Sequence, residues 1–138
     1  MCGWHTKAER MENTRILIVD DETDAGEILS LRLGRRGFTP TYVTSGEAAL
    51  AYLDKDTTDV VVLDVKMPGM DGLETLRHIR EKYATLPVII LSGHADMQDA
   101  AKGMELGAFF YLLKPVNLED LCHKIEDART QQALDGNG

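Results

Sequence analysis

The sequence has few cysteines, no long apolar run and fewer basic than acidic residues. Only two of its 138 residues are cysteine, Cys2 and Cys122, and neither belongs to a CxxC or Cys/His pattern. This excludes a disulfide framework and a zinc site, and a reducing cytoplasmic environment fits best. Because no apolar run reaches the roughly 18 residues of a membrane span, we expect no membrane association.

The charge balance argues against one further class of function. The chain carries 15 lysines and arginines against 23 aspartates and glutamates, which gives a formal net charge of -8. Such a surface repels phosphate backbones, so we expect no direct binding of nucleic acid. The length suits one domain with a single apolar core.

Three segments are expected along the chain. Residues 1–13 show neither apolar periodicity nor the apolar stretch of a signal peptide, and we interpret them as a disordered leader or an upstream extension. Residues 14–131 are expected to form the domain. Residues 132–138 are polar and rich in glycine, which predicts a flexible tail.

Within residues 14–131, short apolar runs alternate with amphipathic stretches. This pattern is typical of β-α units that place helices on both faces of a parallel sheet. The expected strands are 15–19, 39–43, 60–63, 88–91 and 109–113, and the expected helices are 24–36, 46–53, 73–82, 97–106 and 118–130. Pro40 places the second strand at an edge. Ser45 and Asn117 are expected N-caps, and Gly37 and Gly107 are expected C-caps.

Polar residues close four of the apolar runs: Asp20 and Asp21 after ILIV, Asp64 after VVVL, Ser92 after VIIL, and Lys114 after FFYLL. Because the carboxyl ends of parallel strands meet at one edge of a sheet, we expect these side chains to share one crevice. Mg²⁺ prefers a few oxygen ligands and keeps several waters, so the three aspartates can hold it without a closed cage. As an alternative, Asp21 and Asp64 only begin turns or cap helices. That interpretation suits one aspartate better than three crowded negative charges, which need a cation among them.

Four segments carry a resemblance to a known family: ILIVDDE, VVLDVKMPGMDG, VIILSGHAD and GAFFYLLKP resemble the successive signatures of response-regulator receiver domains. The resemblance extends over about residues 15–130. It implies the flavodoxin-like (βα)5 fold, a parallel five-stranded sheet of order 2-1-3-4-5 that is also known from flavodoxin itself, with helices on both faces. The pattern of alternating β-α units agrees with that fold.

The resemblance also implies roles for the residues at the strand ends. Asp64 corresponds to the phosphoacceptor, and Asp20, Asp21 and Asp64 correspond to the magnesium ligands together with the backbone carbonyl of Lys66. A carboxylate is a weak nucleophile, so the incoming phosphoryl group must be held in line and its charge neutralised by Mg²⁺ and by the ammonium of Lys114.

Further roles follow from the same resemblance. The hydroxyl of Ser92 is expected to donate to a phosphoryl oxygen once the domain is modified. Ser92 and Tyr111 then form the switch. As an alternative, Tyr111 is a half-buried ring with a hydrated hydroxyl. The peptide bond between Lys114 and Pro115 corresponds to one that is often cis in this family, which makes Pro115 a candidate cis-proline.

We therefore predict a phosphoryl-accepting receiver in two-component signal transduction. Its donor is expected to be a sensor histidine kinase or a phosphotransfer protein, and its output a changed affinity for a downstream protein effector, with dimerisation on phosphorylation left open. It is not expected to be an enzyme beyond its own phosphoryl transfer and dephosphorylation. The segments SGHAD and KPVNLEDL resemble receivers of nitrogen-regulation-type activators, so both a single-domain regulator and a fragment of a longer one stay open.

Two alternatives remain at this point. A pseudo-receiver would be a constitutive protein-binding module, but such proteins usually lack an acidic residue or the lysine, and here none is missing. A magnesium-dependent phosphatase of the haloacid-dehalogenase-like class resembles a DxD arrangement with a second acid two residues after the first. Position 66 is lysine, which argues against that class.

Overall fold

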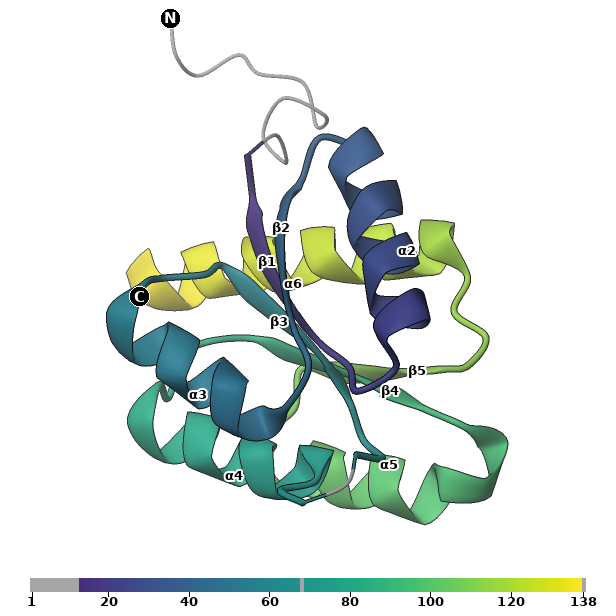
Figure 1. The fold of residues 1–138 in the computed structure, drawn as a ribbon. Helices are drawn as coiled ribbons and strands as arrows, with labels where there is room; N and C mark the ends of the chain where they lie inside the picture. The colour runs from purple at the N-terminus through teal and green to yellow at the C-terminus, as the bar shows by residue number, and fades with distance from the viewer. Residues whose placement is uncertain (1–12, 68, 138) are drawn as a thin grey trace, which may run out of the picture.

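A computed structural model describes residues 13–67 and 69–137, apart from the side chains of His94 and residues 133–137. Five parallel strands form one sheet of order β2-β1-β3-β4-β5 (Figure 1). The strands are β1 Arg15–Val19, β2 Thr39–Val43, β3 Val60–Asp64, β4 Val88–Ser92 and β5 Phe110–Leu113. The helices are α2 Thr23–Arg35, α3 Gly46–Lys55, α4 Gly72–Lys82, the 3-10 turn η1 His94–Asp96, α5 Met97–Glu105 and α6 Leu118–Asn137.

The predicted fold class is confirmed, including the strand order. The strand that contains Pro40, β2, lies at an edge of the sheet, where a residue without a backbone donor is tolerated. The leader expected over residues 1–13 lies outside the described residues except for Asn13. Among the described helices, none combines the length and the apolar character that a membrane crossing requires.

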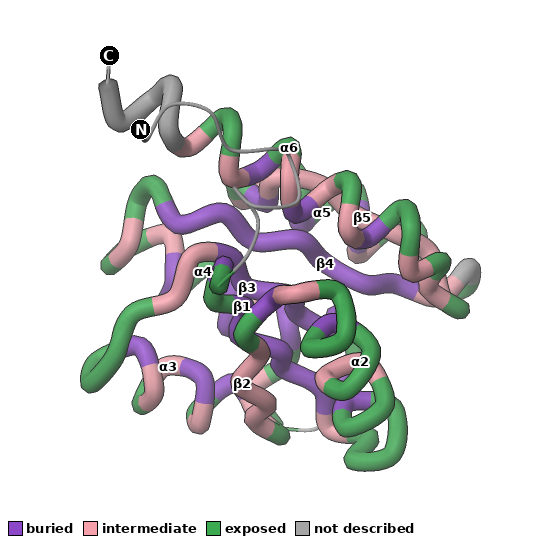
Figure 2. Tube along the Cα trace, turned by 90° about the horizontal axis from the view of Figure 1, so that it is seen from above, coloured by how far each residue is buried: buried purple, intermediate pink, exposed green. Residues whose placement is uncertain are grey.

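Helices cover both faces of the sheet because successive strand residues point to opposite sides (Figures 1 and 2). In β1, Leu17 and Val19 pack into the cluster beneath α3 and α4, whereas Ile16 and Ile18 pack into the cluster beneath α2 and α6. The central strands β3 and β4 are buried along their whole length (Figure 2). Burial on both faces explains the continuous apolar runs of the sequence.

The helix ends follow the predicted chemistry with one exception. The side chain of Ser45 accepts the N–H of Ala48 at 3.0 Å, and Asn117 caps α6 in the same way. Gly37 and Gly107 have positive φ angles of 94° and 104° at the ends of α2 and α5.

The exception is the end of α6. This helix continues to Asn137, so residues 132–137 are helical where a flexible tail was expected from residue 132. Residues 131–134 are glutamine, alanine and leucine, which are good helix formers, and the first glycine of the segment comes only at position 136.

Candidate functional site

The register of the sheet brings the predicted polar residues to one edge. Val19 of β1 pairs with Leu63 of β3, so Asp20 follows its strand beside Asp64. On the other side of β3, Ser92 pairs with Leu113 at the end of β5, and the N–H of Lys114 donates to the carbonyl of Ser92 at 2.8 Å. The carboxyl ends of β1, β3, β4 and β5 therefore lie together at one edge of the sheet, around Asp64.

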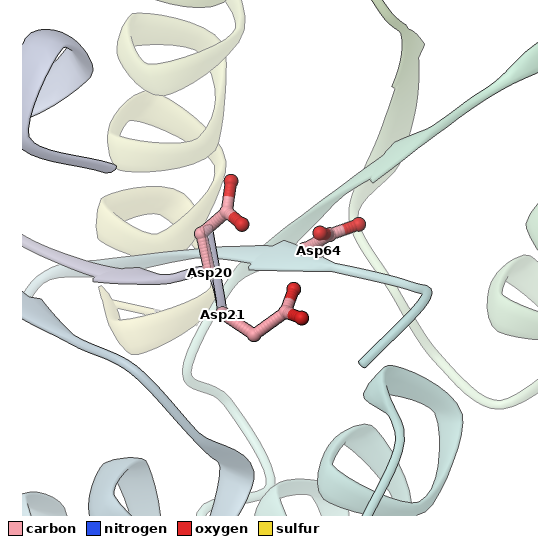
Figure 3. Close-up of side chains that lie close together, drawn as sticks. All are labelled: Asp20, Asp21 and Asp64. Carbon is pink, nitrogen blue, oxygen red and sulfur yellow. The ribbon is translucent and has the colours of Figure 1, made fainter. Parts of the chain in front are cut away.

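Three carboxylates converge there (Figure 3). One oxygen each of Asp20, Asp21 and Asp64 lies within 4.8 Å of the other two. Asp20 and Asp64 are only 5% and 2% exposed, whereas Asp21 is accessible to solvent. Three acidic oxygens with one open side suit a hard divalent cation that keeps water ligands.

The carboxylate of Asp64 receives two donors on the same oxygen. The ammonium of Lys114 lies 3.0 Å from Oδ1, and the backbone N–H of Lys66 donates to Oδ1 at 3.2 Å. Burial nevertheless raises the pKa of Asp64 to about 6, and the negative charge of Asp20 adds to that rise while both donors oppose it. Burial lowers the pKa of Lys114, but the pairing with Asp64 outweighs it and the net pKa is raised. Lys114 contributes one positive charge beside three carboxylates, so without a further cation the site carries net negative charge.

The loop after β3 is folded back against the strand end. The N–H of Gly72 donates to the carbonyl of Val65 at 2.9 Å, and a Cβ at Gly72 would lie 2.3 Å from the carbonyl oxygen of Asp64. Only glycine therefore fits where α4 begins. The side chain of Asp71 accepts the N–H of Glu74 at 2.9 Å and caps this helix.

The remaining predicted residues lie in β4 and β5 or shortly after β5. The hydroxyl of Ser92 is buried and lies 3.2 Å and 3.1 Å from the carbonyl oxygens of Gly93 and Asp96. The ring of Tyr111 is half-buried and stacks on Phe110 with 5.3 Å between the ring centroids. The peptide bond between Lys114 and Pro115 is cis.

Two contacts at the site involve residues that sequence reasoning did not select. The hydroxyl of Tyr42 in β2 donates to the backbone carbonyl of Asp20 at 2.7 Å. Its ring lies where a Cβ on Gly26 would be, only 2.1 Å from the nearest ring atom. The amine of Lys66 reaches the carboxylates of Asp96 and Asp99, at 3.6 Å each. No local pattern marks either contact, because each depends on how separate elements pack.

A groove opens directly beside the acidic residues. It has a volume of about 270 Å³ and runs between α2 and the segment after β5. Asp20 and Lys114 lie at one part of its wall, and Ile28 and Leu29 of α2 line another. Ile28 is 51% exposed, so this wall offers apolar surface to a partner.

Comparisons with known proteins identify the family to which this chain is similar. The family model described as the response regulator receiver domain matches residues 16–126. The DNA-binding transcriptional regulator NtrC of Salmonella typhimurium is 36% identical over 118 residues, which are 86% of this chain and 25% of NtrC. The regulatory protein AtoC of Escherichia coli is 34% identical over 120 residues, or 87% of this chain and 26% of AtoC. The chain thus spans about a quarter of the length of these relatives.

Solved structures show the same similarity. A response regulator receiver domain protein from Clostridium thermocellum superposes with a TM-score of 0.84 at 34% identity, covering 88% of this chain and 98% of that one. NtrX from Brucella abortus, solved with ADP, has a TM-score of 0.86 at 28% identity, with 91% of this chain and 29% of NtrX covered.

Proposed function

The chain belongs to the response regulator receiver domain family of two-component signalling, and on that premise we propose that Asp64 accepts a phosphoryl group from a phosphohistidine. The donor is a sensor histidine kinase or a phosphotransfer protein, and the reaction takes place in the cytoplasm. The observation that carries this proposal is the buried carboxylate of Asp64, which lies among two further carboxylates and 3.0 Å from an ammonium.

The contacts of Asp64 assign its atoms to the reaction. Both donors from the described residues end on Oδ1, so we assign the attack on phosphorus to Oδ2. The bond from phosphorus to the imidazole nitrogen breaks as the bond to Oδ2 forms, and an acyl phosphate results. The ammonium of Lys114 is close enough to neutralise charge on the transferring group. Hydrolysis of the acyl phosphate returns the carboxylate, so the domain acts on no substrate other than itself.

A magnesium ion completes the charge balance of this proposal. Asp20, Asp21 and Asp64 would hold it with the backbone carbonyl of Lys66. The bound ion supplies neutralisation of phosphoryl charge. The rise in the pKa of Asp64 supports this assignment, because a buried carboxylate beside like charges gains most from a cation.

Two surfaces are assigned to partners. The groove beside α2 receives the phosphodonor protein, since it combines exposed apolar surface with direct access to Asp20 and Lys114. The face built by α5, β5 and α6 receives the downstream effector or a second copy of the domain. Ser92 and Tyr111 connect the site to that face, because β4 pairs with β5 along its length.

The test uses acetyl phosphate as a small acyl phosphate donor and intact mass as the readout. With Mg²⁺, the wild-type protein should gain one phosphoryl group, and with a chelator it should gain none. Asp64→Asn should gain none under either condition. Asp59→Asn is the matched control, because Asp59 lies directly before the same strand, and it should react like the wild type. Equal uptake by wild type and Asp64→Asn, or none by either, would contradict the proposal.

A further inference from the structure

The loop that follows Asp64 is joined to the segment that follows Ser92 by an ionic contact. The amine of Lys66 lies 3.6 Å from Oδ1 of Asp96 in η1 and 3.6 Å from Oδ2 of Asp99 in α5. One positive charge thus faces two carboxylates that come from adjacent elements. We call Lys66, Asp96 and Asp99 the loop clamp.

The same segment holds the hydroxyl of Ser92. The nearest acceptors of Oγ are the carbonyl oxygens of Gly93 at 3.2 Å and Asp96 at 3.1 Å. A serine hydroxyl has one proton, so it cannot donate to these carbonyls and to a phosphoryl oxygen at the same time. Donation to a phosphoryl group on Asp64 therefore requires that Ser92 leaves the acceptors of its own loop.

We propose that the loop clamp stabilises the resting position of Ser92 and that Asp96 and Asp99 are positioning residues of the switch. By fixing η1 to the loop after β3, the clamp keeps the carbonyl of Asp96 where the hydroxyl of Ser92 can reach it. Release of the clamp favours the conformation in which the hydroxyl turns to the phosphoryl group. This inference rests on the proposed phosphorylation of Asp64.

The expected size of the effect follows from exposure. The side chain of Lys66 is 66% exposed, whereas those of Asp96 and Asp99 are 21% and 34% exposed. Ion pairs of this kind are weak one by one, so loss of Asp99 should shift the resting equilibrium by about two- to fivefold. Salt should screen the same contact.

The first experiment measures hydrogen exchange in the unphosphorylated protein in a chelating buffer. The N–H of Asp96 donates to the carbonyl of Gly93 at 3.0 Å, so its exchange rate reports opening of η1. Asp99→Asn and Lys66→Met should each raise that rate about two- to fivefold, and the double variant should add little to either. Lys66→Arg should restore the wild-type rate. In 1 M salt the difference between wild type and Asp99→Asn should disappear.

Asp54→Asn is the matched control, because Asp54 joins α3 to α4 through Lys82 in a comparable surface pair. This variant should leave the exchange of Asp96 unchanged. The proposed loop clamp is refuted if the N–H of Asp96 exchanges at the same rate in Asp99→Asn as in Asp54→Asn. It is also refuted if the effects of Asp99→Asn and Lys66→Met on that rate are additive.

The second experiment asks whether the clamp acts on the switch. With Mg²⁺ and acetyl phosphate, Asp99→Asn should gain its phosphoryl group about two- to fivefold faster than Asp54→Asn, because a larger fraction of the protein is in the competent conformation. Faster exchange of Asp96 without faster phosphorylation would overturn the role in switching. Failure of the wild type itself to accept phosphate would instead refute the proposed function, while the exchange data would still test the clamp.

Discussion

Strand β3 has an aspartate at each end, and the two carboxylates have opposite surroundings. Asp59, directly before the strand, accepts the N–H of Arg15 at 2.8 Å and lies 3.2 Å from the guanidinium of Arg129. The guanidinium of Arg15 is also near, at 3.6 Å. At this end, two cations face one carboxylate, and the contacts join β1 and α6 to the residue before β3.

At the other end of β3 the ratio is reversed. Asp64 is paired with the ammonium of Lys114 and lies beside two further carboxylates, those of Asp20 and Asp21. Burial raises the pKa of Asp64, so the carboxylate is held in a less favourable state than in water. The ion pairs at the amino end of the strand thus stabilise the fold. The carboxyl end instead retains uncompensated negative charge, which can bind a cation and, at Asp64, attack a phosphoryl group.

The largest expected effect comes from removing the ammonium of Lys114, the one that the described part of the chain pairs with Asp64. Lys114→Met should slow phosphoryl uptake from acetyl phosphate by about 10- to 100-fold, because the transferring group loses a positive charge. The loss is smaller than that of a fully buried donor because Lys114 is partly exposed and Mg²⁺ shares the charge. Arg129→Met, which removes a cation from the other end of β3, should change the rate by less than about twofold. If both variants slow the reaction equally, the two ends of β3 do not differ in their role in phosphoryl transfer.

An intermediate effect is expected at Asp59, and it should appear in stability alone. Asp59→Asn leaves the guanidinium groups of Arg15 and Arg129 without their carboxylate. We expect the free energy of unfolding in urea to fall by about 1–2 kcal/mol, between the values for exposed and buried pairs. Phosphoryl uptake of the folded protein should stay at the wild-type rate. An unchanged free energy of unfolding would show that the arginines do not stabilise the amino end.

The sequence allowed prediction of the site wherever regular geometry determines position. The apolar runs that precede Asp20, Asp64 and Lys114 identify parallel strands, and parallel strands place their carboxyl ends together. The strand order and the edge position of Pro40 followed from the family resemblance and from the missing backbone donor of proline.

Contacts that depend on the direction of a side chain could not be predicted from the sequence in the same way. The amine of Lys66 reaches Asp96 and Asp99 only because the loop after β3 packs beside η1 and α5, and the hydroxyl of Tyr42 reaches the carbonyl of Asp20 from the neighbouring strand. The end of α6 was also missed, since a polar composition does not distinguish a loose tail from a helix of good helix formers.

The last predicted effect, no larger than the one at Asp59, concerns the pH dependence of stability and separates the ends of β3 most sharply. Because the pKa of Asp64 is about 6 in the folded protein and near 3.9 when unfolded, the folded state binds more protons between these values. The contribution of Asp64 to stability is therefore complete below about pH 4 and is lost as the pH rises through about 6. Asp64→Asn cannot ionise, so relative to this variant the wild type should lose about 1–2 kcal/mol between pH 4.5 and 7.5 without metal.

Urea unfolding of both proteins at the two pH values measures this loss. Lys114 stays charged in this range because its pKa is raised, so the absence of its partner in Asp64→Asn adds only a constant offset. An equal difference in unfolding free energy at both pH values would mean that Asp64 is not destabilised by its surroundings. Saturating Mg²⁺ at pH 7.5 should stabilise the wild type more than Asp64→Asn, because a cation favours the charged carboxylate. The stability that the protein loses when Asp64 ionises without a metal therefore favours the binding of a cation at the carboxyl end of β3.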